Sequence, residues 1–174
     1  VDYEPSAEQT QEFFKIVQNK LHFAISGKTA AELISERADA SKPNMGLTSW
    51  KRAKVRKDDV VVAKNYLNED EMESLNRIVT MYLDYAEDQA KRHQAIYMRD
   101  WREKLDAFLK FNERDILGNA GQVTKEVADK LALEQYEVFH RNRLTEEAER
   151  EAISDDIEFK KYLRKVEAEK KYPG

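Results

Sequence analysis

The segment of residues 36–50 gathers more chemically useful side chains than any other part of the sequence. Pro43 and Gly46 favour turns, and rigid loops that hold diverse polar groups are common binding sites. Carboxylates, hydroxyls and a nearby imidazole could carry acid–base chemistry if the fold brought them together. With two residues from neighbouring predicted helices, the segment supplies the candidate catalytic set: His22, Glu36, Arg37, Asp39, Lys42, Asn44, Ser49 and Asn76.

The same segment also has a purely structural interpretation. Asp39 and Ser41 could satisfy backbone groups within the turn, and Trp50 could fill part of the core. Met45 and Leu47 interrupt the polar run, so we expect the loop to pack against the body of the protein. The sequence leaves both interpretations open.

A basic run follows this segment directly. Five of the seven residues 51–57 are lysine or arginine. Clustered cations beside an aromatic side chain could hold phosphates and stack a base, whereas a solvated surface run is the simpler interpretation of one short cluster in an acidic protein. The candidate nucleic-acid-binding residues are Trp50, Lys51, Arg52, Lys54, Arg56 and Lys57.

Metal and cofactor chemistry find little support in the sequence. The three histidines, His22, His93 and His140, are too far apart to form a metal-binding motif. The chain has no cysteine, which excludes disulfides, thiol catalysis and cysteine-based zinc sites. No glycine-rich phosphate loop is present. We therefore predict no metal and no cofactor. His22 lies in an apolar helical segment, where a histidine is more often a core residue than a catalytic base.

Helical signals recur along the chain and must position these residues. Thr29-Ala-Ala-Glu32 and Asn68-Glu-Asp-Glu71 each start with a capping residue that an acidic residue follows three positions later. Ser6 and Gln9 form a similar start. With apolar residues at helical spacing, these signals predict helices over residues 6–25, 29–38, 58–67, 68–90, 99–111 and 124–139.

Two of these predictions have details that a structure can test. Val55 and residues 60–62 could form a short strand, but a helix capped by Asp58 or Asp59 is preferred because no partner strand is evident. In the three later helices, the predicted apolar positions are Met72, Leu75, Val79, Tyr82, Ala86 and Ala90, then Trp101, Leu105, Phe108 and Leu109, then Val127, Leu131, Leu133, Tyr136 and Phe139.

The C-terminal segment is highly charged and has a narrow apolar seam. Phe159, Tyr162, Leu163 and Val166 keep helical spacing, and Ser154 or Asp155 could cap this helix. Such a seam either docks on its own body or pairs with another copy of the chain.

Overall composition indicates one domain without a strong charge preference. The chain has 174 residues, of which 41% are hydrophobic and 37% charged, and its formal net charge is −4. This balance gives no general attraction to nucleic acid or membranes. No apolar run reaches the roughly 20 residues that a membrane span needs, and no signal peptide is present. We expect a cytoplasmic protein with no membrane partner. The linker-like residues 1–5 suggest a fragment of a longer chain.

Several stretches carry a resemblance to a known family. The loop Glu36-Arg-Ala-Asp-Ala-Ser-Lys-Pro-Asn-Met-Gly-Leu-Thr-Ser-Trp50 is the most specific of them. These stretches closely resemble the C-terminal region of the RhuM virulence-protein family. The similarity covers roughly residues 1–140 and ends near His140. The matching segments are residues 11–25, 29–32, 36–50, 63–68, 75–84 and 101–117.

The resemblance implies a bacterial, virulence-associated protein but does not imply a catalytic mechanism. Similar proteins are bacterial, often encoded on pathogenicity islands or mobile elements, and usually carry an upstream domain that looks DNA-binding. The family has no established catalytic residues to carry over. Some similar proteins join the shared upstream part to a Fic-type domain, but its His-Pro-Phe-x-x-Gly-Asn-Gly-Arg signature is absent from this sequence.

We therefore predict an all-α fold: a single helical bundle of about six helices with a long charged C-terminal helix. Residues 1–140 form the RhuM-like bundle, and residues 141–174 form an amphipathic extension. The expected function is assembly or partner binding in a bacterial, DNA-associated virulence protein, with an upstream DNA-binding-like domain as one partner. An enzyme with its site at the 36–50 loop and a nucleic-acid binder that uses residues 51–57 are the alternatives.

Overall fold

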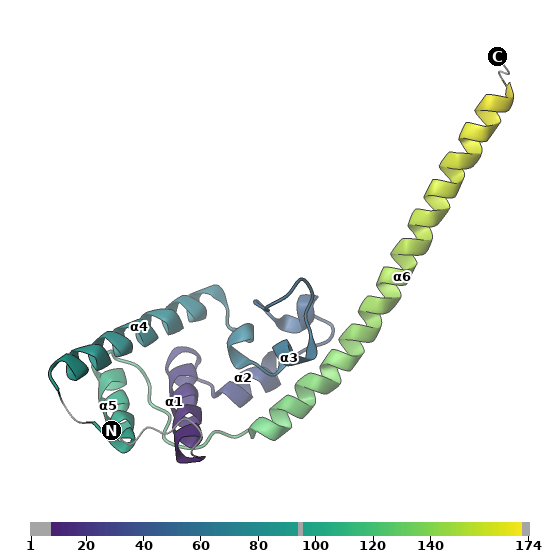
Figure 1. The fold of residues 1–174 in the computed structure, drawn as a ribbon. Coiled ribbons are helices and arrows are strands. Elements are labelled where there is room, and N and C mark those ends of the chain that lie inside the picture. Colours follow the sequence, from purple (N-terminus) through teal and green to yellow (C-terminus); the bar gives the residue numbers. More distant parts are fainter. Residues whose placement is uncertain (1–7, 94–95, 172–174) are drawn as a thin grey trace. The chain divides into compact units, whose positions relative to one another are not determined.

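Helices make up the regular structure of the computed structural model, which describes residues 8–93 and 96–171. No strand occurs in these residues, so the predicted all-α class with about six helices and a long charged C-terminal helix is confirmed. None of the described helices is long and apolar enough to cross a membrane. The elements are α1 (Glu8–Ser26), α2 (Ala30–Arg37), η1 (Pro43–Gly46), α3 (Lys57–Val60), η2 (Ala63–Tyr66), α4 (Glu69–Lys91), α5 (Met98–Phe111) and α6 (Lys125–Lys171), where η marks a 3-10 turn (Figure 1).

Two predicted helix starts are confirmed in atomic detail. The Thr29 hydroxyl accepts a hydrogen bond from the Glu32 amide at 3.3 Å, and the Glu32 carboxylate accepts one from the Thr29 amide at 2.8 Å. The same exchange joins Asn68 and Glu71, at 2.8 and 2.9 Å. Each exchange satisfies two amides that a helix start leaves without partners. The predicted cap at Ser6 lies outside the described residues.

One hydrophobic core cluster lies where α1 meets α4 and α5 (Figure 1). Leu105 and Leu109 of α5 are fully buried there, as is Ile78 of α4, which the predicted stripe omitted. Ala90, which that stripe included, is exposed. The core is closed by Ala24 and by partly buried residues packed around it: Val17, Leu21, Ile25, Leu75, Val79, Tyr82, Phe108 and Ile116.

The predicted helix over residues 58–67 is wrong. α3 ends at Val60, Val62 is extended, and η2 begins at Ala63. The cause is a pair of side-chain hydrogen bonds: the Asn65 amide donates to the carbonyl of Asp59, and the Tyr66 hydroxyl donates to the carbonyl of Val60. Both carbonyls therefore have partners without a continuing helix.

The first turns of α6 agree with the predicted stripe only in part. Tyr136 is buried as predicted and Leu131 and Phe139 are half-buried, but Val127 is 57% and Leu133 is 37% exposed. Ala128 and Ala132, which the predicted stripe omitted, are buried. The small side chains of Ala128 and Ala132 let the backbone of the helix approach its neighbours closely. Helical periodicity alone does not distinguish this row of residues from the adjacent row that contains Val127 and Leu131.

The chain divides into two units, Val1–Tyr136 and Glu137–Gly174. In the second unit α6 continues without interruption, so Ser154 and Asp155, predicted to cap a separate helix, lie inside it. Every side chain from Ala148 to Lys165 is exposed. The predicted boundary between a bundle of residues 1–140 and an extension of residues 141–174 stays a prediction.

Candidate functional site

The loop after α2 folds into a left-handed turn. Asn44, Met45 and Gly46 have φ values of 52°, 61° and 80°. Left-handed backbone costs a residue with a side chain roughly 1–2 kcal/mol, and the full burial of the Met45 side chain offsets part of this cost. The predicted packing of the loop onto the body is confirmed at Met45 and Leu47. Asn44 is exposed, and asparagine tolerates this conformation better than most residues.

Asp39 bonds within its own loop. Its Oδ1 accepts hydrogen bonds from the amide of Ser41 at 2.9 Å and from the Ser41 hydroxyl at 2.6 Å. These bonds, chiefly the one from the hydroxyl, lower the pKa of Asp39, and the Lys42 ammonium lies 3.9 Å from its other oxygen. A carboxylate with a lowered pKa that is engaged in an exposed turn is a poor general base.

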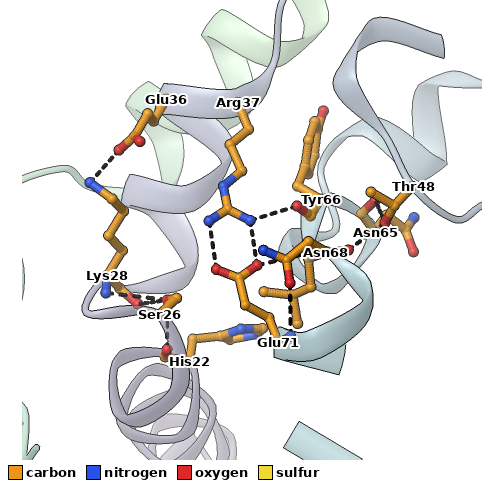
Figure 2. Close-up of polar contacts among 11 residues, drawn as sticks. His22, Ser26, Lys28, Glu36, Arg37, Thr48, Asn65, Tyr66, Asn68 and Glu71 are labelled. Atoms are coloured by element: carbon orange, nitrogen blue, oxygen red, sulfur yellow. Dashed lines mark hydrogen bonds and ion pairs between the residues drawn. The ribbon is translucent and has the colours of Figure 1, made fainter. Parts of the chain in front are cut away.

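Arg37 joins α2 to the start of α4 (Figure 2). Its two terminal nitrogens donate to the two carboxylate oxygens of Glu71 at 2.6 and 2.7 Å, and one of them also donates to the carbonyl of Tyr66 at 2.8 Å. The hydrogen bond from Arg37 lowers the pKa of Glu71 and raises that of Arg37. Glu71 also accepts from the Asn68 amide, so this bidentate pair holds three segments together.

Ser49 lies beside an amide rather than a base. Its hydroxyl is 3.4 Å from the Asn65 side-chain oxygen. The hydroxyl of the neighbouring Thr48 lies 3.0 Å from the carbonyl oxygen of Asn65 and 2.6 Å from that of Leu67, and the two carbonyls share its one proton (Figure 2). A serine nucleophile needs a base that removes its proton, and the hydrogen bonds described for this segment supply only structural links.

His22 is buried in α1, and its Nδ1 has no hydrogen-bond partner among the described residues. Burial lowers the pKa of His22, and the charge of Glu71 opposes that shift, so the imidazole is neutral near pH 7. The ring lines a cavity of about 850 Å³ with apolar residues of α1, α2 and α4, including Ile16, Ile34 and Val79.

The other seven candidates do not line this cavity. Glu36 lines a separate cavity of about 410 Å³ and pairs there with Lys28. Asn76 is exposed on α4. The described part of the chain holds no cluster of three or more histidine, aspartate or glutamate residues arranged for a metal. The eight candidate catalytic residues therefore do not line one common cavity among those described, and a catalytic role for them stays a prediction.

The basic run forms an exposed loop with buried anchors. All five of its cations are exposed, and Trp50 is half-buried. Val55 is 2% exposed, and the buried carboxylate of Asp59 accepts hydrogen bonds from the amides of Lys51 and Arg56, at 3.3 and 3.0 Å. These contacts fix the backbone at both ends of the run, so the cations project from a defined scaffold.

Four residues that organise this region were not among the candidates: Asp59, Asn65, Tyr66 and Glu71. Glu71 carried a signal, since its place three residues after Asn68 marked it as a capping residue. The rest of its role depends on Arg37, which is 34 residues away in sequence. Asn65 and Tyr66 act by bonds to backbone carbonyls, for which the sequence has no recognisable pattern.

A second candidate surface lies on the C-terminal unit. Phe159, Tyr162 and Leu163 are 59%, 63% and 43% exposed. Val166, which belongs to the same predicted seam, is one of the residues whose side chains the structure does not describe. At 100° per residue, one face of the helix carries a set that we term the tail stripe: Leu144, Ala148, Ala152, Phe159, Tyr162 and Leu163.

Comparison with known proteins adds one finding. The sequence matches the model of the family described as "Virulence protein RhuM family" over residues 1–147. No curated protein and no solved structure matches it. The matched range includes the whole first unit, while most of the tail stripe lies beyond it.

Proposed function

Since this chain belongs to the RhuM virulence-protein family, we propose that it is the assembly or partner-binding module of a bacterial, DNA-associated virulence protein. The observation that carries the proposal is the tail stripe. Aligned and exposed large apolar side chains are typical of surfaces that another protein covers, and this stripe extends along a helix of the second unit.

The energetics of the tail favour a partner. Burial of a large apolar side chain stabilises a complex by about 1.5–3 kcal/mol, and the stripe exposes Leu144, Phe159, Tyr162 and Leu163. Ion pairs between Asp156 and Lys160 at 2.6 Å, and between Glu146 and Arg150 at 3.8 Å, support the helix. Such exposed pairs contribute only about 0.3–0.5 kcal/mol each, so we expect a covering partner to supply most of the stabilisation.

Replacement of both Phe159 and Leu163 with lysine is expected to abolish association of the tail. Two charges in the stripe would have to be buried without partners, which is costly. Light scattering across a concentration series is expected to give a mass above one chain for the unaltered protein and a mass of one chain for the variant.

The matched control is Ile157→Lys. Ile157 is also an exposed apolar residue of α6, but its position is on the opposite face of the helix from the stripe. This variant is expected to retain the mass of the unaltered protein. Equal loss of association in Ile157→Lys and in the double variant would contradict the assignment of the stripe.

The basic loop supports a second function, nucleic-acid binding. The supporting observation is its anchoring: Val55 and Asp59 hold a backbone that presents five exposed cations next to Trp50. Cations on a fixed scaffold lose less conformational entropy when they bind phosphates than cations on a mobile tail. A half-buried indole beside them offers a surface on which an unpaired base can stack.

The combined substitutions Lys51→Glu and Arg52→Glu are expected to abolish binding to a fluorescent single-stranded oligonucleotide in an anisotropy titration. For the unaltered protein, affinity is expected to fall steeply with salt, and each phosphate contact contributes about 0.7 to the logarithmic slope for a single strand. A control variant with Lys91→Glu and Lys130→Glu makes the same charge change at two exposed positions outside the loop. If the loop variant binds as tightly as the control, this second function is eliminated.

A further inference from the structure

The charges of the tail are divided along its length. Residues 146–158 contain seven acidic residues and one basic residue, and residues 160–171 contain six basic residues and two acidic ones, Glu167 and Glu169. The boundary falls at Phe159, near the C-terminal end of the apolar stripe. The acidic half consists of Glu146, Glu147, Glu149, Glu151, Asp155, Asp156 and Glu158, and the basic half starts with Lys160, Lys161, Arg164 and Lys165.

This division makes the helix complementary to itself in one orientation only. When two copies lie antiparallel with Phe159 at the centre, residues 146–158 of each, with seven acidic residues and one basic residue, lie against residues 160–171 of the other, with six basic residues and two acidic ones. A parallel pair places acidic against acidic and basic against basic. Since like charges in close contact destabilise an interface while opposite charges steer and orient it, the antiparallel arrangement is strongly favoured.

Asp155 points to the same orientation. At 100° per residue it falls within the stripe, between Ala152 and Phe159. In a parallel pair it would face Asp155 of the other copy across the seam, which places two carboxylates together with few neutralising groups. In the antiparallel pair it lies opposite Leu163 of the other copy, next to the cations Lys160 and Arg164.

We infer that the tail of α6 pairs antiparallel with the same helix of a second copy, with the two-fold axis near Phe159; this inference rests on the assembly function proposed above. With the axis at Phe159, residues 147–171 of α6 lie opposite the same residues of the second copy, which is long enough for a short coiled coil, about 36 Å at 1.5 Å per residue. A self-complementary surface of this kind closes at two copies and leaves no unpaired face for further growth.

Cysteine pairing tests the orientation directly, because the natural chain contains no cysteine. Asp155→Cys and Leu163→Cys are prepared in separate chains, mixed in reduced form and oxidised in a glutathione buffer. The antiparallel pair is expected to give the 155–163 heterodisulfide in at least about tenfold excess over either homodisulfide, a preference of about 1.4 kcal/mol. Ile157→Cys, on the opposite face, is the control and is expected to form little disulfide with itself.

The mass of the unaltered protein separates the two proposals. A mass of two chains with an excess of the 155–163 heterodisulfide supports the inference. Homodisulfides in excess, or a mass of three or more chains, overturn antiparallel pairing but leave assembly through the stripe intact. A mass of one chain at all concentrations, with no disulfide above the Ile157→Cys control, overturns self-assembly together with the inference.

Discussion

Replacement of Gly46 with alanine is expected to lower the free energy of unfolding by about 3 kcal/mol. A β-carbon at this position would lie 2.3 Å from the carbonyl oxygen of Arg37, well inside van der Waals contact, and the φ of 80° disfavours any residue with a side chain. The clash is with backbone at the end of α2, so it cannot be relieved by a side-chain rotation. Urea unfolding monitored by circular dichroism measures the effect.

Gly118→Ala is the matched control for this substitution. No atom lies within 4 Å of a β-carbon built at Gly118, and its φ is not positive. This variant is expected to be as stable as the unaltered protein, or slightly more stable because alanine restricts the unfolded chain. Equal stability of the two variants would mean that the 39–50 loop does not pack against α2 as described.

Arg37→Ala is expected to lower the free energy of unfolding by about 2 kcal/mol. The substitution removes both hydrogen bonds to Glu71 and the hydrogen bond that Arg37 donates to the carbonyl of Tyr66. Charge-assisted hydrogen bonds contribute roughly 1.5–3 kcal/mol, and the value is reduced here because both side chains are partly exposed. Arg77→Ala, which breaks an exposed pair with Glu73, is the control and is expected to cost at most about 1 kcal/mol.

The Arg37–Glu71 pair also has a pH signature. Its hydrogen bonds lower the pKa of Glu71 in the folded protein from the ordinary value of 4.5. The pair therefore contributes its full stabilisation above about pH 4.5, and this contribution is lost as the pH falls toward the lowered pKa. Arg37→Ala should reduce this acid sensitivity in unfolding curves between pH 6 and pH 3. An unchanged pH profile would show that the pair does not form in solution.

Local signals in the sequence predicted the helix starts well. Thr29 with Glu32 and Asn68 with Glu71 lie within one turn of each other, so residue type and spacing alone identify them. The failure between Asp58 and Leu67 has the opposite cause. Asn65 and Tyr66 bond to the carbonyls of Asp59 and Val60 and stop the helix, and no propensity rule anticipates such bonds.

The candidate site shows the limit of reasoning from proximity in sequence. Asp39, Asn44 and Ser49 were grouped because they share one segment, yet Asp39 bonds to Ser41, Asn44 serves a left-handed turn and Ser49 lies beside Asn65. A loop displays its side chains in several directions, so a cluster in sequence is not a cluster in space. Grouping by helical periodicity is safer, since the backbone dictates which residues share a face.

The mass of the protein in solution with and without its tail decides whether the tail joins two copies. Sedimentation equilibrium is run on the full chain and on a chain that lacks residues 142–174, which keeps Tyr136 and the hydrophobic core of the first unit. We expect two copies per particle for the full chain and one for the shortened chain. The same number of copies in both would contradict this expectation.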